Sequence, residues 1–132
     1  MTQRWPLILG FFAGIAAVAA GLSQGASPVE GWQLAARWTA KLGFALLLIT
    51  YSASSLARLW RGPATQALLR ERRWWSLGFA ACHTAHLVAL VTFLRLSGEA
   101  RPVPILLFAG GAYATMYAMA LTSSDRAMRA LG

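Results

Sequence analysis

Four long apolar runs alternate with shorter polar segments along the chain. The runs cover residues 5–22, about 42–59, 74–94 and 103–122, and three of them contain no charged residue. A helix of about 20 residues rises about 30 Å, which is the thickness of the hydrocarbon core of a bilayer. The pattern therefore predicts an all-α membrane protein, a four-span transmembrane helical bundle that forms a single domain over residues 1–132.

The composition agrees with a membrane protein. Of 132 residues, 58% are hydrophobic and only 12% are charged, with a mean hydropathy of +0.53. Soluble domains carry about 25% charged residues, and a chain of this size cannot bury so much apolar surface by itself. The sequence contains no phosphate loop, dinucleotide fingerprint or zinc set, so it excludes the common soluble enzyme classes.

The polar segments between the runs have distinct characters. Residues 23–36 are rich in Gly, Ser and Pro and predict a loop, after which Arg37 and Lys41 precede the second span at the interface. Residues 58–73 form a basic loop in which residues 64–73 predict a short amphipathic helix on the membrane surface. A rival interpretation makes residues 1–19 a cleaved signal peptide, with Ala17-Val18-Ala19 as its cleavage site.

Basic residues divide unequally between the two sides of a four-span arrangement. One side receives eight of the twelve, and the other receives Arg37, Lys41, Arg95 and Arg101; the eight are Arg4, Arg58, Arg61, Arg70, Arg72, Arg73, Arg126 and Arg129. The positive-inside rule then predicts that both termini and the basic loop are cytoplasmic, in the cell membrane, which is the inner membrane if the source is bacterial.

In a membrane protein, the net charge of +8 indicates the lipid bilayer as a partner. The basic residues gather between the apolar runs, where they favour contact with the anionic heads of the lipid bilayer. No nucleic-acid recognition motif accompanies them, so we expect no nucleic-acid partner. The single cysteine, Cys82, excludes an internal disulfide and is expected to be a small packing residue.

Both histidines of the chain lie in the third run. His83 and His86 are about 13 and 18 Å from Trp74 along a helix, near the middle of the span. A separation of three residues places the two rings on one helix face. Ionisable groups at this depth are costly and tend to mark function, so the pair is the candidate site.

Imidazole in an apolar setting suits two roles. It is a good axial ligand for haem iron, but axial ligands approach iron from opposite faces, so two histidines on one helix face cannot hold one haem between them. An opposing ligand must come from elsewhere, and Met116 or Met119 on the fourth run is one candidate. The alternative role is a hydrogen bond between helices, for example to a hydroxyl of the second span.

Several local patterns resemble the ferric-reductase-like transmembrane domain family. These are Ala36-Arg37-Trp38-Thr39, Leu56-Ala57-Arg58-Leu59, the stretch Arg72-Arg73-Trp74-Trp75-Ser76-Leu77-Gly78 leading to His83-Thr84-Ala85-His86-Leu87, and Ala120-Leu121-Thr122-Ser123-Ser124-Asp125 before Leu131-Gly132. The resemblance covers roughly residues 37–132. It implies a helical bundle that holds b-type haem between histidines of different spans and passes electrons across the membrane, as the transmembrane part of an oxidoreductase.

The resemblance also implies roles for single residues. His86, which precedes Leu87, matches the third-helix haem ligand, so His86 is the expected iron ligand and His83 a second cofactor-binding residue. The family pattern continues with further histidine-bearing spans beyond the match to Gly132. The resemblance therefore implies a truncated gene product, a partial sequence or a shortened relative, and an opposing ligand from outside these residues, for example from a second copy. A homo-oligomer or a separate electron donor or acceptor protein is the expected partner.

Two other function classes remain open at this stage. A non-catalytic membrane assembly or scaffold protein would use the histidines for packing, with Gly10, Gly14 and Gly110 on contact faces. A small transporter or proton path through the histidines is disfavoured, because the spans contain no carboxylate and no paired broken helices.

Overall fold

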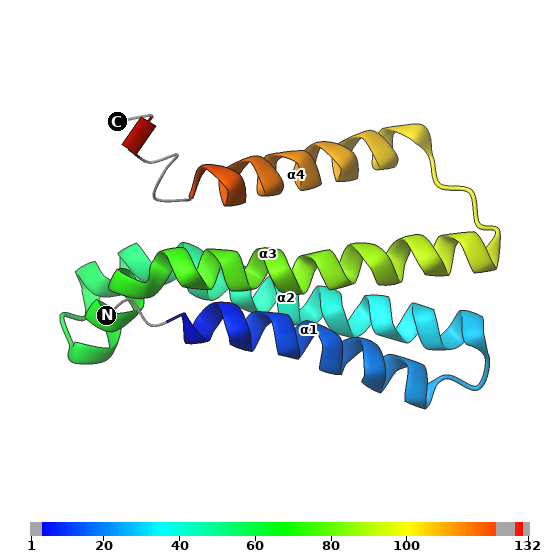
Figure 1. Cartoon of the computed structure of the whole chain (residues 1–132), viewed down its shortest axis with the longest axis horizontal. Coiled ribbons are helices and arrows are strands. Elements are labelled where there is room, and N and C mark those ends of the chain that lie inside the picture. The colour runs from blue at the N-terminus through cyan, green and yellow to red at the C-terminus, as the bar shows by residue number, and fades with distance from the viewer. Residues whose placement is uncertain (1–3, 124–128, 131–132) are drawn as a thin grey trace. The chain divides into compact units, whose positions relative to one another are not determined.

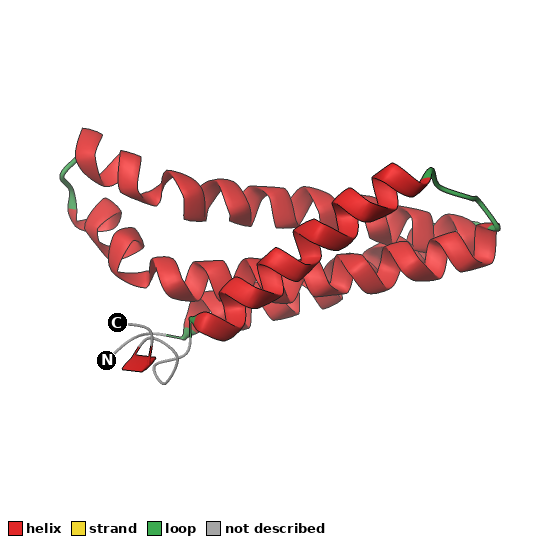
Figure 2. Cartoon of the chain, turned by 90° about the horizontal axis from the view of Figure 1, so that it is seen from above, coloured by secondary structure: helices red, strands yellow, loops and turns green. Residues whose placement is uncertain are grey.

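The computed structural model describes residues 4–123 and 129–130, and it is helical with short connecting loops (Figure 2). The four helices are α1 (Trp5–Gln24), α2 (Pro28–Leu59), α3 (Pro63–Ser97) and α4 (Val103–Thr122). The described residues contain no strand, and each of the four helices is long and apolar enough to cross a membrane. The predicted all-helical class and the four helices long and apolar enough to span are confirmed. Asp125 and Arg126 lie outside the described residues.

The second helix begins much earlier than its apolar run. Residues 28–36, predicted as part of a loop, are the first turns of α2. Ser27 is the N-cap and its hydroxyl accepts from the backbone N–H of Glu30 at 3.2 Å, while the Glu30 carboxylate accepts from the N–H of Ala26 at 3.0 Å. This is a variant of the capping box, in which the carboxylate reaches the N–H one residue before the N-cap, and Pro28 lies in the first turn. The loop prediction was wrong because it weighed composition above capping chemistry.

The basic segment between the second and third spans is mostly helical. The connection between α2 and α3 consists of residues 60–62 alone, and residues 64–73 are the first turns of α3 rather than a separate surface helix. Thr65 fastens this turn, since its hydroxyl accepts from the N–H of Gly62 at 3.1 Å and donates to carbonyls of the loop. The charged stretch therefore continues the helix axis beyond the apolar part of α3.

Helices α1, α2 and α3 pack together as an up-down-up unit of residues 1–97 (Figure 1). Small residues bring their backbones close. A Cβ atom built on Gly10 would lie 2.2 Å from the carbonyl oxygen of Gly78, and one on Gly21 would lie 2.2 Å from the backbone nitrogen of Ala35. Gly14 meets Cys82 in the same way at 3.2 Å. The predicted small-residue faces of the first span are thus used inside this chain, as contacts to α3 and α2.

The contact between Gly21 and Ala35 fixes the register of α1 against α2. Counting from it along two antiparallel helices, residues 5–24 of α1 lie level with about residues 32–51 of α2. Arg37 and Lys41, expected to precede the second span, therefore lie beside the span of α1. Both side chains are exposed, and the Lys41 ammonium lies 4.8 Å from the ring of Trp38, one turn toward the start of α2. Lys41 thus points toward the helix end, as a snorkelling lysine does.

Aromatic and basic side chains gather where α1 and the apolar part of α3 begin. The rings of Trp5 and Trp75 meet edge to face at 5.1 Å, and the guanidinium groups of Arg4 and Arg73 lie 5.5 and 5.4 Å from the ring of Trp74. Tryptophan and arginine together are typical of a membrane–water interface. This cluster, the tryptophan–arginine belt, marks one end of the three-helix unit.

The remaining helix belongs to a second compact unit, residues 98–132. Gly98 has a φ of 67°, a left-handed conformation that glycine adopts without strain, directly after α3 ends at Ser97. Pro102 and Pro104 flank the first residue of α4, where a missing N–H costs little. The 20 residues of α4 rise about 30 Å, enough for one crossing.

Candidate functional site

The candidate histidines lie together on α3, as their spacing predicts. The ring centroids of His83 and His86 are 5.0 Å apart with an angle of 34° between the ring planes. Both side chains are half-buried and face α2 within the three-helix unit. They lie on one face of one helix, so they cannot approach a single iron from opposite sides.

His86 is tied to α2 by its Nδ1 atom. This nitrogen lies 3.0 Å from the carbonyl oxygen of Ala36 and 3.1 Å from the hydroxyl oxygen of Thr39. The Thr39 hydroxyl in turn donates within its own helix, to the carbonyl oxygens of Ala35 at 2.7 Å and Ala36 at 3.1 Å. Its oxygen is thereby left as an acceptor toward the imidazole.

These partners fix the tautomer of a neutral His86. A carbonyl oxygen only accepts hydrogen bonds, so Nδ1 carries the proton and donates it to Ala36, shared with Thr39. The other ring nitrogen, Nε2, then holds a lone pair. Histidines that ligate metals are oriented in this way, by a hydrogen bond from the second nitrogen to a backbone carbonyl.

Thr39 lies at the centre of this contact between α2 and α3. Its side chain is fully buried, as is that of Cys82, whose Sγ lies 4.0 Å from the Thr39 carbonyl oxygen. Cys82 therefore is the packing residue that the sequence predicts. The predicted hydrogen bond from a histidine to a hydroxyl of the second helix is also confirmed. The sequence did not indicate Thr39, because Thr39 precedes the apolar run that predicts the second span.

His83 lies in a different environment, formed by an aromatic ring and a glycine. Its ring stacks on Phe79 with centroids 5.1 Å apart and 28° between the planes. A Cβ atom on Gly43 would lie 2.9 Å from the Nδ1 atom of His83, so the absence of a side chain at Gly43 makes room for the imidazole. Phe79 and Gly43 were not singled out from the sequence, where an isolated glycine in an apolar run gives little signal.

The other residues that the sequence predicts near a haem are not shown beside the rings of His83 and His86. Arg73, the basic residue of the segment 58–73 that is nearest to His86 in sequence, lies 13 residues before it, which is about 20 Å along α3. Met116 and Met119 belong to the second unit, so their pairing with a histidine stays a prediction. Among the described residues no group of three or more His, Cys, Asp or Glu side chains is placed to hold a metal ion.

Fold and site together define a class: an all-helical protein with four helices long and apolar enough to cross a membrane, and with two histidines packed between the second and third of them. Comparison of the chain with protein-family models, with curated proteins and with solved structures found no match. The resemblance to ferric-reductase-like domains therefore rests on the local patterns of this sequence, and the function is argued from the site.

Proposed function

We propose that this protein is an integral membrane component of b-type haem electron transfer, in which His86 would hold the iron. The observation that supports this best is the hydrogen bond from His86 Nδ1 to the Ala36 carbonyl, because it directs the lone pair to Nε2. The orientation is held from a helix backbone rather than from a mobile side chain. An axial ligand needs such a fixed ring.

The neighbouring residues suit a haem pocket in the same region. His83 presents a flat ring beside His86, and Phe79 stacks on His83. The side chains of His83 and His86 are only half-buried. Haem iron, when bound, would carry one electron at a time by cycling between its ferric and ferrous states. The protein residues would supply the ligand, its orientation and an apolar surrounding that excludes water.

The iron would need a second ligand opposite His86, and the source of that ligand indicates the partner of this protein. Both histidines of the chain lie on one face of α3, so any opposing ligand would come from another polypeptide, such as a second copy. The sequence has no flavin or nicotinamide fingerprint, so a separate protein or a quinone would deliver the electrons. The proposed location is the cell membrane, with the tryptophan–arginine belt at the cytoplasmic interface.

The proposal is tested by the visible spectrum of the purified full chain in detergent, recorded reduced minus oxidised after supplementation with haem. A b-type α-band is the expected result. Size-exclusion chromatography of the same sample shows whether the coloured species is a monomer or an assembly. A folded, helical protein that stays colourless at saturating haem would refute the proposal.

A colourless protein would favour the second candidate, a non-catalytic membrane assembly or scaffold protein. The same hydrogen bond supports that role, since it joins α3 to α2 through His86 Nδ1 and Ala36. Interhelical hydrogen bonds in membranes contribute about 0.6 kcal/mol on average, which is enough to help fix helix packing. In that case His86 would matter for stability and for nothing else.

The Thr39 hydroxyl provides a finer test of the haem site. In Thr39→Val the imidazole loses one acceptor and keeps the Ala36 carbonyl, so we expect bound haem with affinity weakened by about tenfold, the lower end of outer-shell effects. Titration of the apoprotein with haem measures the change. Thr50→Val is the matched control, since Thr50 is buried on the same helix and its hydroxyl donates to Leu46. Equal effects of the two substitutions would contradict this role of Thr39.

A further inference from the structure

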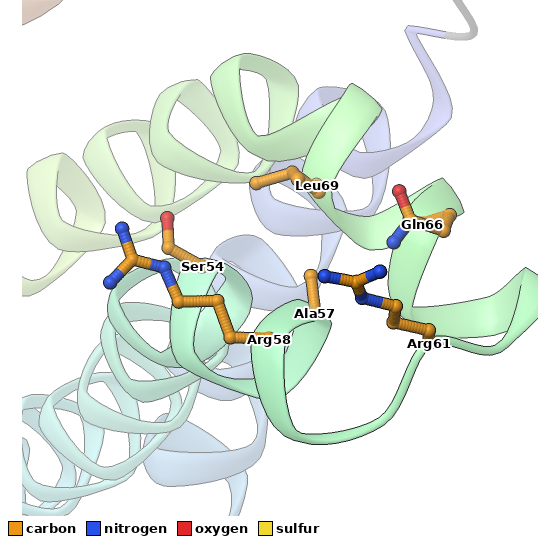
Figure 3. A pocket seen from close by; sticks show the side chains of 6 residues that line it. All are labelled: Ser54, Ala57, Arg58, Arg61, Gln66 and Leu69. Atoms are coloured by element: carbon orange, nitrogen blue, oxygen red, sulfur yellow. The ribbon is translucent and has the colours of Figure 1, made fainter.

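A pocket of about 480 Å³ opens where α2 ends and α3 begins, far from the histidines. It is lined by the last turns of α2, the loop after it and the first two turns of α3 (Figure 3); its lining residues are Ser54, Ala57, Arg58, Arg61, Gln66 and Leu69. Leu69 is 17 residues before His86, about 25 Å along α3. The pocket is therefore separate from the proposed haem site and does not depend on it.

The polar lining of this pocket is made of hydrogen-bond donors. Figure 3 shows Arg58 beside Ser54 and Arg61 beside Gln66, on either side of Ala57. None of the six lining residues is acidic. Two guanidinium groups with an amide and a hydroxyl nearby are the donor set that recognises phosphate, because a guanidinium presents paired N–H groups to two oxygens.

The acidic residue nearest in sequence, Glu71, does not neutralise the positive charge of the pocket arginines. Residues 58–73 contain five arginines and one acidic residue, Glu71. The Glu71 carboxylate accepts a hydrogen bond from Trp5 Nε1 at 3.1 Å, which directs it toward α1. The only salt bridge among the described residues, between Arg101 and Glu99, lies elsewhere. An anion from outside the chain is thus the partner that the pocket fits.

The position of the pocket indicates the source of that anion. Arg72 donates to Ser54 at 3.2 Å, so the pocket edge is level with Arg72, just before Trp74 of the tryptophan–arginine belt. Tryptophans mark the membrane interface, and lipid phosphates lie at the aqueous edge of that layer. The pocket also has an apolar side, formed by Ala57 and Leu69, which suits the glycerol and upper acyl region of a lipid.

We propose that this pocket binds the phosphate of an anionic phospholipid, with Arg58 and Arg61 as the recognising side chains. Basic pockets between membrane helices on the cytoplasmic side are known to hold such head groups. Free phosphate shares the chemistry but would gain nothing from the apolar wall or from the interfacial position, which is why the lipid is the proposed occupant.

The test is lipid binding by the delipidated full chain in detergent, followed by native mass spectrometry. Phosphatidylglycerol is the probe, and phosphatidylcholine and inorganic phosphate are the comparison ligands. We expect phosphatidylglycerol to bind best, with affinity reduced about fivefold in Arg58→Gln and in Arg61→Gln, and further in the double variant. Both side chains are exposed, so the single variants are expected to fold, and circular dichroism checks this.

Arg95→Gln is the matched control, an exposed arginine in the last turn of α3 at the opposite end of the unit. Its affinity for phosphatidylglycerol is expected to equal that of the unsubstituted protein. Equal losses in Arg95→Gln and Arg58→Gln would show diffuse charge attraction and overturn the proposal. So would equal binding of phosphatidylglycerol and phosphatidylcholine, or inorganic phosphate binding as tightly as the lipid.

Discussion

His86→Ala is expected to abolish the b-type absorption band and to lower bound haem by more than about tenfold, beyond the effect of any outer-shell change. Alanine removes the Nε2 lone pair that we assign to the iron, while the Ala36 carbonyl and the Thr39 hydroxyl stay in place on α2. The measurement is the reduced-minus-oxidised spectrum with a haem-to-protein ratio, on protein whose helicity is checked by circular dichroism.

Two further variants make this result specific. Thr84→Ala changes a half-buried residue at the same depth of α3, on another face, and is expected to keep the band. Imidazole added to the His86→Ala protein is expected to restore part of it, since a free ligand can enter the space that the side chain leaves. A band of unchanged height in His86→Ala would rule out this residue as the iron ligand.

Gly10→Ala is expected to destabilise the three-helix unit by about 1–3 kcal/mol or more. The added Cβ would lie 2.2 Å from the carbonyl oxygen of Gly78 and 2.6 Å from its Cα, so it meets backbone atoms that cannot rotate away. Relief requires α1 and α3 to separate along their shared face, with loss of close packing. Thermal unfolding in detergent, followed by circular dichroism, measures the change.

A graded series of glycines provides the controls. Gly14→Ala meets Cys82 and Ala85 at 3.2 Å, so its cost is expected to be smaller than that of Gly10→Ala. Gly62→Ala, in the loop before α3, has nothing within 4 Å of its added atom and is expected to be close to neutral. The reverse order of stabilities would contradict the register of α1 against α3. Unchanged stability of all three would contradict the packing itself.

The glycine contacts also change what the scaffold hypothesis predicts for substitutions of Gly10 and Gly14. From the sequence, Gly10 and Gly14 were candidates for contact with another chain. In the structure they face α3 of their own chain. Enlarging them is therefore expected to impair folding first, and any effect on assembly would follow from that. Gly110 belongs to the second unit, and its place on an assembly face stays a prediction.

Much of the fold follows from the sequence by simple physics. Apolar runs of about 20 residues specify spanning helices whatever their partners are, because backbone groups in lipid must be satisfied within the segment. The start of α2 was also within reach, since Ser27-Pro28-Val29-Glu30 is a capping box with a proline in the first turn. It was missed because Glu30, Gly31 and Gln33 lower the average hydropathy of the first turns of the helix.

The candidate site shows where sequence reasoning stops. The three-residue spacing of His83 and His86 places them on one face, because helix geometry is local. Their partners are not local: Thr39 and Ala36 are 47 and 50 residues from His86, and only the antiparallel register of α2 and α3 brings them within hydrogen-bond distance. The same register sets Gly43 against His83.

The sequence by itself thus determined the all-helical class, the number of helices long and apolar enough to cross a membrane, and the pairing of the histidines on one helix face. Tertiary structure alone decided which nitrogen of His86 is held, which residues hold it, and that two arginines at the end of α2 line a pocket with α3. The physical reason is that hydropathy and helical period act within one segment. Register depends on how small residues of separate helices fit together, and no single segment carries that information.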